Sequence, residues 1–290
     1  MPMIDQASRL RALAAQQTGD VPLFSSRVLA ITSGKGGVGK TNVVAGLAMT
    51  LARQGQRVLV LDADFGLANL DILLGLTPQW TLEHVLRGER VLEEIVLDGP
   101  CGIKVIPASS GIQELTQLDT LSELRLIQGL QRLSGSFDWM LIDTAAGIHD
   151  SVIRLLIAAQ EVVLVTTPEP TSLVDAYAMV KVVHQRDPGK KVWVMVNNAH
   201  TAEEAEETLE QLQAATTRFL GKDLKVLGML PSDPHLLQSV RQQRGVVDLY
   251  PSSPAALAFG ELAQHLQKNG TLEKDGFAAF WKALSSPEEP

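Results

Sequence analysis

Hydrophobic positions along the chain fall into short continuous runs, separated by longer stretches in which apolar residues recur at helical spacing. The runs occupy residues 28–32, 58–62, 103–107, 140–143, 162–166, 192–197 and 226–231. The helical stretches are clearest at residues 42–54, 151–159, 172–184 and 202–219. Apolar strands that alternate with amphipathic helices are typical of a mostly parallel β-sheet covered by helices on both faces. We therefore predict an α/β domain over residues 27–269.

The two ends of the chain depart from this alternation. Residues 1–26 have apolar residues at helical spacing up to Ala14, and Gly19 and Pro22 then break the pattern, which predicts a short helix and a linker. Residues 270–290 contain a second short helical segment followed by a tail rich in Ser, Pro and Glu. Each end is thus expected to form a separate small element outside the domain.

Composition narrows the classes of function. The chain has 290 residues and a net charge of -8, which argues against a surface built mainly to bind nucleic acid. Its single cysteine, Cys101, cannot form an internal disulfide or a site that needs several cysteines. No apolar run approaches the roughly 18 residues of a membrane-spanning helix. We expect a cytoplasmic protein whose contact with a membrane is peripheral.

A glycine-rich loop between the first predicted strand and the first predicted helix carries the clearest chemistry. It consists of Gly34, Lys35, Gly36, Gly37, Val38, Gly39, Lys40 and Thr41, and Asn42 follows. Such a loop turns its backbone N–H groups toward phosphate oxygens at the positive end of a helix. Lys40 is predicted to reach the β- and γ-phosphates, and the Thr41 hydroxyl to bind Mg²⁺. The loop therefore predicts a nucleoside triphosphate as ligand.

Carboxylates end two of the predicted strands, where a parallel sheet binds its ligands. Asp143 follows four apolar residues, as expected for a residue that holds Mg²⁺ directly or through water. Asp62 is a candidate for the hydration shell of the same ion, and a purely structural role for it stays open. Asp64 is the candidate for orienting the attacking water.

The loop, with its additional lysine, resembles that of the MinD/ParA group of P-loop ATPases, which reads KGGxGK[ST]. The resemblance implies ATP and Mg²⁺ as ligands and a homodimer that sandwiches the nucleotides. In that group the first lysine reaches the phosphates of the partner subunit, which implies a catalytic role for Lys35 beside Lys40 and Asp64. Slow hydrolysis, stimulated by a partner or a membrane, is implied as well.

The same resemblance suggests how the base is bound. It implies that Asn197 hydrogen-bonds adenine and that a loop of Pro231, Ser232 and Asp233 wraps against the base. Asp233 followed by a proline is also typical of a helix cap. The residue after Asn197 is Asn198, where this group often has arginine. The guanine-recognition pattern Asn-Lys-x-Asp is absent from the sequence, which favours ATP over GTP.

The N-terminal helix matches the pattern DQAxxLRxL of the flagellar-number regulators known as FlhG or FleN. The resemblance implies that this helix binds and stimulates FlhF, a GTPase of the signal-recognition-particle type, with Gln6 near its catalytic site. The partner-binding residues would be Asp5, Gln6, Ala7, Leu10, Arg11 and Leu13.

The C-terminal helix has one apolar stripe, because its large apolar residues are spaced i, i+3, i+4 and i+7. They are Phe277, Phe280, Trp281 and Leu284. One interpretation is an anchor that lies in the plane of the membrane, and the other is a terminal helix docked on the core. MinD-like proteins carry a membrane-targeting helix at this end, so the resemblance favours the anchor.

Together these patterns predict a P-loop ATPase. The resemblance implies a dimerising switch that regulates flagellar number and placement, and that cycles between a monomer and an ATP dimer at the membrane. Its implied partners are a second copy, the flagellar GTPase, flagellar switch or C-ring proteins, a flagellar transcription regulator and inner-membrane lipid, whereas nucleic acid is not expected. Two alternatives stay open. One is a MinD-like ATPase that positions the septum or another cargo, and the other is an anti-activator binding module with negligible hydrolysis.

Overall fold

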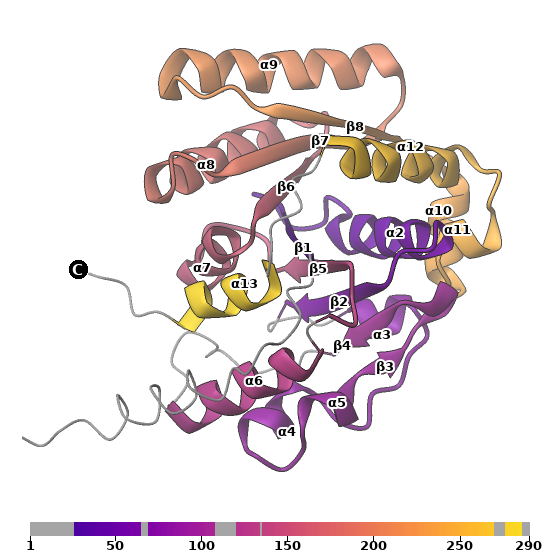
Figure 1. Cartoon of the computed structure of the whole chain (residues 1–290). Coiled ribbons are helices and arrows are strands. Elements are labelled where there is room, and N and C mark those ends of the chain that lie inside the picture. The colour runs from indigo at the N-terminus through magenta and orange to yellow at the C-terminus, as the bar shows by residue number, and fades with distance from the viewer. Residues whose placement is uncertain (1–25, 65–68, 108–119, 134, 270–275, 286–290) are drawn as a thin grey trace, which may run out of the picture.

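A computed structural model describes residues 26–64, 69–107, 120–133, 135–269 and 276–285. The described residues form an eight-stranded sheet with the order β3-β4-β2-β5-β1-β6-β7-β8 (Figure 1). All neighbouring strands are parallel except β3, which is antiparallel to β4. The strands are β1 (Arg27–Thr32), β2 (Val58–Ala63), β3 (Leu97–Asp98), β4 (Lys104–Ile106), β5 (Trp139–Thr144), β6 (Glu161–Thr166), β7 (Lys191–Ala199) and β8 (Lys225–Pro231).

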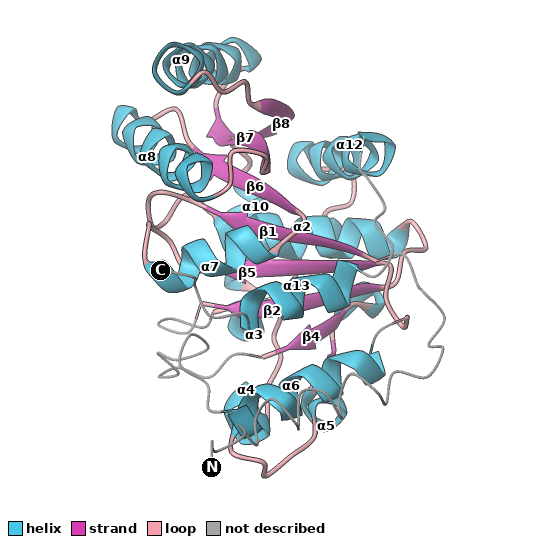
Figure 2. Ribbon diagram, turned by 60° about the vertical axis from the view of Figure 1, so that its left-hand side comes forward, coloured by secondary structure: helices cyan, strands magenta, loops and turns pink. Residues whose placement is uncertain are grey.

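Helices connect the strands and cover both faces of the sheet (Figure 2). The longer ones are α2 (Lys40–Arg53), α6 (Thr120–Leu133), α7 (Asp150–Ala158), α8 (Pro170–Arg186), α9 (Ala202–Leu220), α10 (Pro234–Arg241), α12 (Pro254–Asn269) and α13 (Gly276–Ser285). The short ones are α3 (Leu70–Leu73), α4 (Leu82–Leu86), α5 (Leu92–Ile95), α11 (Val246–Leu249) and the 3₁₀ turn η1 (Pro100–Gly102). The predicted α/β class and the seven predicted strands are confirmed.

The core consists of one apolar layer on each face of the sheet. In β1, Val28 and Ala30 point into the layer formed with α4, α6, α7, α8 and α13, whereas Leu29 and Ile31 point into the layer formed with α2 and α12. Because both faces are covered, the strand buries every side chain, which explains its continuous apolar sequence. Fully burying one such side chain contributes about 1.5–3 kcal/mol.

The edge of the sheet where β1 and β6 begin is held by a buried ionic cluster. Arg27 is 2% exposed and donates hydrogen bonds to Glu161 and to the carbonyl of Leu266 at the end of α12. Glu161 also accepts from Lys191 and, at 3.0 Å, from the indole N–H of Trp193. Burial opposes the ionisation of Glu161, but these donors outweigh it and lower its pKa. The cluster ties the first strand of the domain to its last long helix.

Helix α13 is docked on the domain, against α6, α7 and the beginning of β1 (Figure 1). Phe280 and Leu284 are buried in the core layer, and Arg154 donates a 3.0 Å hydrogen bond to the Leu284 carbonyl. The side chains of Phe277 and Trp281 lie outside the described set. Half of the predicted apolar stripe therefore packs in the core in this state, and the role of the stripe at a membrane stays a prediction.

The first residue of α13 fits closely against the point where the N-terminal segment joins the domain. A Cβ atom at Gly276 would lie 2.4 Å from the carbonyl oxygen of Ser26 and 1.9 Å from the side-chain nitrogen of Gln160. Gln160 in turn accepts a 2.9 Å hydrogen bond from the backbone N–H of Val28. Only glycine fits at this contact, which joins both ends of the domain at one place.

Candidate nucleotide site

The predicted phosphate loop lies between β1 and α2, at the edge where the parallel strands end (Figure 1). Gly39 precedes the first residue of α2 with a φ of 87°, a left-handed conformation that favours glycine. The loop therefore curls directly into the N-terminus of a 14-residue helix. Free backbone N–H groups and the positive end of the helix dipole meet there, as binding of phosphate requires. The predicted strand–loop–helix context is confirmed.

Lys40 and Asp143 form a buried ion pair at the end of β5. The Lys40 ammonium lies 2.8 Å from the Asp143 carboxylate, and the two side chains are 8% and 1% exposed. The Thr41 hydroxyl bonds to the same carboxylate. Burial raises the pKa of Asp143, and the charge of Lys40 only partly opposes this. The structure thus brings together the predicted phosphate-binding lysine and two predicted Mg²⁺ ligands.

Asp62 lies beside Asp143, because the two residues are paired in the parallel register of β2 and β5. Burial and the neighbouring charge of Asp143 raise the pKa of Asp62 to about 7. Two buried carboxyl groups on neighbouring strands need more positive charge than Lys40 supplies, so they fit a bound cation. No cluster of three His, Cys, Asp or Glu side chains is found among the residues with described positions.

Asp64, the candidate for orienting water, follows β2 and is half-buried. Its backbone N–H donates a 3.1 Å hydrogen bond to Asp62, and its charge also acts on Asp143. The three predicted aspartates therefore lie at one edge of two neighbouring strands. Whether Asp64 orients the attacking water stays a prediction.

Lys35 lies at the open side of the loop and contacts the beginning of α8. Its ammonium is 2.5 Å from the Glu169 carboxylate and 3.0 Å from the Thr171 hydroxyl. The Lys35 side chain is 37% exposed, and that of Glu169 is 64% exposed. The pairing was not predicted, although both partners lie in a segment with the order Pro-Glu-Pro-Thr-Ser. Lys35 is therefore accessible from outside, and its proposed reach to a partner subunit stays a prediction.

The end of β5 and the loop that follows it are hydrogen-bonded to β1 and to the residue just before the phosphate loop. The Thr144 hydroxyl donates to the Ile31 carbonyl at 3.0 Å, and the Gly147 N–H donates to the Ser33 carbonyl at 2.9 Å.

The residues predicted to bind adenine lie at the ends of β7 and β8. The Asn197 side chain is buried and donates a 2.7 Å hydrogen bond to the Val38 carbonyl of the phosphate loop. Pro231 ends β8, and the backbone N–H of Ser232 donates to the Ala199 carbonyl at 2.8 Å. The structure thus joins the predicted base-binding residues to the phosphate loop, a contact that sequence spacing could not show.

Asp233 has the helix-cap geometry that its sequence context also allowed. It accepts 2.9 Å hydrogen bonds from the backbone N–H groups of His235, in α10, and Ala255, in α12. Burial opposes ionisation of Asp233, but these bonds outweigh it and lower its pKa. Both carboxylate oxygens therefore help to fix this loop, and its contact with the base stays a prediction.

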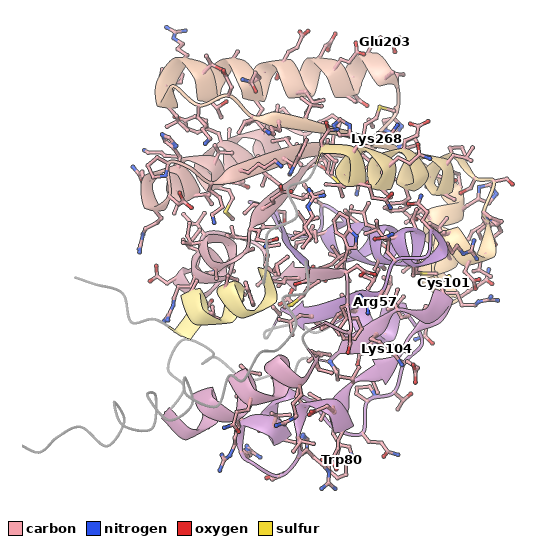
Figure 3. The ribbon with its side chains drawn as sticks, in the orientation of Figure 1. Arg57, Trp80, Cys101, Lys104, Glu203 and Lys268 are labelled. Carbon is pink, nitrogen blue, oxygen red and sulfur yellow. The ribbon has the colours of Figure 1, made fainter. Side chains whose placement is uncertain are left out.

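The structure does not describe the partner-binding residues predicted near the N-terminus. Asp5, Gln6, Ala7, Leu10, Arg11 and Leu13 lie outside the described residues. Cys101 lies at the far end of α2, where the Arg53 guanidinium is 3.3 Å from its sulfur (Figure 3). No helix in the described part of the chain is both long and apolar enough to cross a membrane.

Comparison with known proteins gives consistent matches. Residues 26–190 match the model of a family described as an AAA domain, and residues 125–267 match that of a family described as NUBPL iron-transfer P-loop NTPase. The antiactivator FleN of Pseudomonas aeruginosa is 44% identical over 238 residues, which cover 82% of this chain and 85% of that protein. The flagellum site-determining protein YlxH of Helicobacter pylori is 33% identical over 266 residues, which cover 90% of each chain.

Solved structures show the same fold. The septum site-determining protein MinD of Pyrococcus horikoshii, in complex with Mg-ADP, superposes with a TM-score of 0.69 and 28% sequence identity. The match covers 84% of this chain and 96% of that one.

Proposed function

The chain belongs to the MinD-like P-loop ATPases, in the branch of FleN and FlhG, and from that premise we propose that it is an ATP-driven dimerising switch that regulates the number and placement of flagella. The observation that carries the proposal is the assembly at one sheet edge of Lys40, Thr41 and Asp143, with Lys35 exposed beside them. The first three suit a nucleotide in the same chain, and an exposed Lys35 suits a second copy.

Nucleotide binding would exchange partners within this cluster. The β- and γ-phosphates would take Lys40 from Asp143, and Thr41, Asp143 and Asp62 would then hold Mg²⁺ directly or through water. The bound Mg²⁺ supplies charge neutralisation for the triphosphate. Asp64 would orient the attacking water, and Lys35 would leave Glu169 to reach the phosphates of the partner subunit. Turnover is expected to be slow, because the useful output is the conformational state.

The docked α13 gives this switch a defined resting state. Because Phe280 and Leu284 are buried in the core, the helix must leave α6 and α7 before its apolar stripe can enter a lipid surface. We propose that the ATP dimer releases two such helices, and that their avidity holds the dimer on the cytoplasmic face of the membrane. Hydrolysis would return a cytoplasmic monomer with α13 docked.

The dimer step is tested by light scattering of the full-length protein with and without ATP and Mg²⁺. The Asp64→Ala variant, in which hydrolysis is blocked, is expected to be a dimer with ATP and a monomer without it. Lys35→Ala is the matched variant and should remain monomeric in both conditions. An Asp64→Ala protein that stays monomeric with saturating ATP would disprove the proposal.

The flagellar role is tested with a synthetic peptide that spans residues 2–17. We propose that this segment stimulates a flagellar GTPase of the signal-recognition-particle type through Gln6. The peptide should accelerate GTP hydrolysis by that enzyme, and a Gln6→Ala peptide should not. No stimulation by either peptide would leave the ATPase switch intact and favour a MinD-like role in positioning a septum or another cargo.

The similarity to a protein named an antiactivator supports a second candidate function. In that case the chain would bind a flagellar transcription regulator in a nucleotide-dependent way, with negligible hydrolysis. Phosphate release measured with and without lipid vesicles separates the two. Release that rises with lipid supports the membrane switch, and release at the background rate in both conditions supports the binding module. Proteins of the flagellar switch or C-ring are further proposed partners.

A further inference from the structure

The edge of the sheet opposite the candidate nucleotide site gathers lysines that have no part in that site. Lys191 and Lys225 are the first residues of β7 and β8, and their ammonium groups lie 5.0 Å and 5.4 Å from the centre of the same Trp193 ring. The Lys191 ammonium also donates a 3.1 Å hydrogen bond to the carbonyl of Asn269, which ends α12. Lys268, exposed in the last turn of α12, is therefore close to the beginning of β7.

A fourth lysine belongs to the same edge. Lys222, in the turn between α9 and β8, donates a 2.8 Å hydrogen bond to the carbonyl of Pro188, in the turn before β7. Lys191 is paired with Glu161, whereas the other three ammonium groups have no carboxylate partner among the described residues. We call this set the lysine edge, and it consists of Lys191, Lys222, Lys225 and Lys268.

Glutamates gather at the other end of the same strands. Helix α9 runs from the end of β7 back to the beginning of β8, and five of its first nine residues are glutamates. Figure 3 labels Glu203 in the first turn of α9 and Lys268 in the last turn of α12. The two ends of these strands therefore differ in the sign of their surface charge. In a chain with a net charge of -8, such a separation orients the protein toward an anionic surface with its lysine edge first.

The segment that leads to α13 starts at the lysine edge. Asn269, which is bonded to Lys191, ends α12, and Gly276 begins α13 beside Ser26, just before β1. Residues 273–285 contain two lysines and two acidic residues, so the helical segment has no net charge with which to attract anionic lipid. A single apolar anchor binds a membrane only marginally, and stable binding takes a second contribution such as a basic surface.

From this arrangement we infer that the lysine edge is a contact for anionic lipid headgroups, separate from α13, which orients the domain on the membrane and holds it there together with the helix. The inference rests on the proposed membrane cycle. The ammonium groups would attract headgroup phosphates through space, and each exposed lysine would strengthen binding by up to about fivefold. Asp223, in the same turn as Lys222, reduces the attraction only in part, because one carboxylate faces three lysines.

Co-sedimentation of the full-length protein with lipid vesicles, in the presence of ATP and Mg²⁺, tests the inference. Neutral vesicles contain phosphatidylcholine alone, and anionic vesicles contain phosphatidylglycerol as about one third of their lipid. The test variant combines Lys222→Gln, Lys225→Gln and Lys268→Gln, and keeps Lys191 because it belongs to the buried ionic cluster.

The test variant should need at least about tenfold more anionic lipid for half-maximal binding than the unmodified protein. Its binding to neutral vesicles should stay within about twofold, because α13 is unchanged. Binding of the test variant to anionic vesicles within about twofold of the unmodified protein would overturn the inference and leave α13 as the membrane contact.

Two matched variants separate the position of the charge from its amount. Arg87→Gln, Lys181→Gln and Arg241→Gln together remove three exposed cations from α8, α10 and the end of α4, and should leave binding to anionic vesicles unchanged. An equal loss in this control would show that net charge, and not the lysine edge, sets the affinity. Arginine at positions 222, 225 and 268 keeps the charge and should retain the binding, because the attraction depends on charge rather than on the amine.

Salt gives an independent measurement. Raising monovalent salt from about 0.1 to about 1 M shortens the Debye length from about 10 to about 3 Å. Binding of the unmodified protein to anionic vesicles should then weaken toward that of the test variant, which should itself change little. An affinity of the unmodified protein that does not depend on salt would contradict the inference.

Failure of the inference can be told apart from failure of the proposed function. If the unmodified protein binds neither kind of vesicle with ATP, the proposed membrane cycle is wrong, and the inference falls with it. If it binds both kinds equally, the cycle stands on α13 alone and the lysine edge is overturned.

The variants must also fold and dimerise as the unmodified protein does. Light scattering with ATP and the thermal unfolding midpoint check this. If the test variant unfolds much earlier, Lys225→Gln with Lys268→Gln takes its place, because both side chains are exposed, and a loss of at least about threefold is then expected.

Discussion

One buried ion pair lies where the central strands begin and another where they end. The two pairs differ in how many hydrogen-bond donors and positive charges surround their carboxylates. At the edge where β1 begins, Glu161 receives hydrogen bonds from Arg27, Lys191 and Trp193, and its pKa is lowered. At the edge where the strands end, the pKa values of Asp62 and Asp143 are raised, although Lys40 is 2.8 Å from Asp143. The Glu161 carboxylate thus receives enough donors to stay ionised, although the buried Nε atom of Arg27 has no hydrogen-bond partner among the described residues. The second pair lacks positive charge, and we attribute this to its role in binding Mg²⁺ and phosphate.

Breaking the ion pair of Arg27 and Glu161 should have the largest effect on stability. Replacing Glu161 with alanine leaves Arg27 buried without its carboxylate partner, and loss of one partner of a buried pair costs about 3–5 kcal/mol. Urea unfolding of Glu161→Ala should show this loss in the absence of nucleotide. A change in unfolding free energy below 1 kcal/mol would mean that the ionic cluster at the beginning of β1 does not stabilise the fold.

Breaking the ion pair of Lys40 and Asp143 should instead affect ATP hydrolysis. Lys40→Met removes the cation that we assign to the β- and γ-phosphates, and ATP hydrolysis should fall by at least about 100-fold. Phosphate release measures this, with Lys104→Met, at the remote edge beside Asp98, as the control expected to retain activity. Hydrolysis by Lys40→Met within tenfold of the normal rate would contradict the assignment of this lysine.

The raised pKa of Asp62 and the lowered pKa of Glu161 predict opposite dependences of stability on pH. Because the folded protein keeps a proton on Asp62 up to about pH 7, whereas the unfolded chain loses it near 3.8, the contribution of Asp62 is present below pH 4 and is lost as pH rises toward 7. The slope is at most about 1.4 kcal/mol per pH unit. Glu161, with its lowered pKa, contributes stability that is lost as pH falls below its ordinary range.

The pH experiment is unfolding without Mg²⁺ or nucleotide between pH 5 and 7, with Asp62→Asn as the comparison. The difference in unfolding free energy between the two proteins should change across this range, in the direction of a relative gain for Asp62→Asn at higher pH. A difference that stays constant with pH would show that Asp62 is already ionised throughout the range.

The exposed pair of Lys35 and Glu169 should contribute least to stability. Both side chains are more than one-third exposed, and such pairs contribute about 0–1 kcal/mol. Glu169→Gln should therefore change the unfolding free energy by less than about 0.5 kcal/mol. A loss of unfolding free energy above 1.5 kcal/mol would mean that this contact stabilises the fold, as the pair of Arg27 and Glu161 does.

The sequence was sufficient for the sheet and the phosphate loop because both depend on residues that are neighbours along the chain. Continuous apolar runs indicate strands buried on both faces, and glycines before a lysine and a threonine indicate the loop. The two-residue strand β3 and the short helices α4 and α5 were not predicted, because they are too brief to show a period. The ends of elements were predicted less well than their existence.

The contacts that complete the site could not be predicted from the sequence, because they join residues far apart along it. Lys35 and Glu169 are separated by 134 positions, and Asn197 and Val38 by 159. The family resemblance implied that Asn197 binds adenine, but only the fold shows that its amide is bonded to the loop. The stripe of α13 was ambiguous for another reason, since docking on a core and entry into lipid require the same apolar spacing.

The contact of Gly276 with Ser26 places the first residue of α13 beside the residue that precedes β1. A protein that binds the chain as far as residue 26 would therefore contact the first turn of α13. Its affinity would depend on whether that helix is docked. In the same way, a fluorescent label placed beside residue 26 would report on the departure of α13 without any modification of the helix itself.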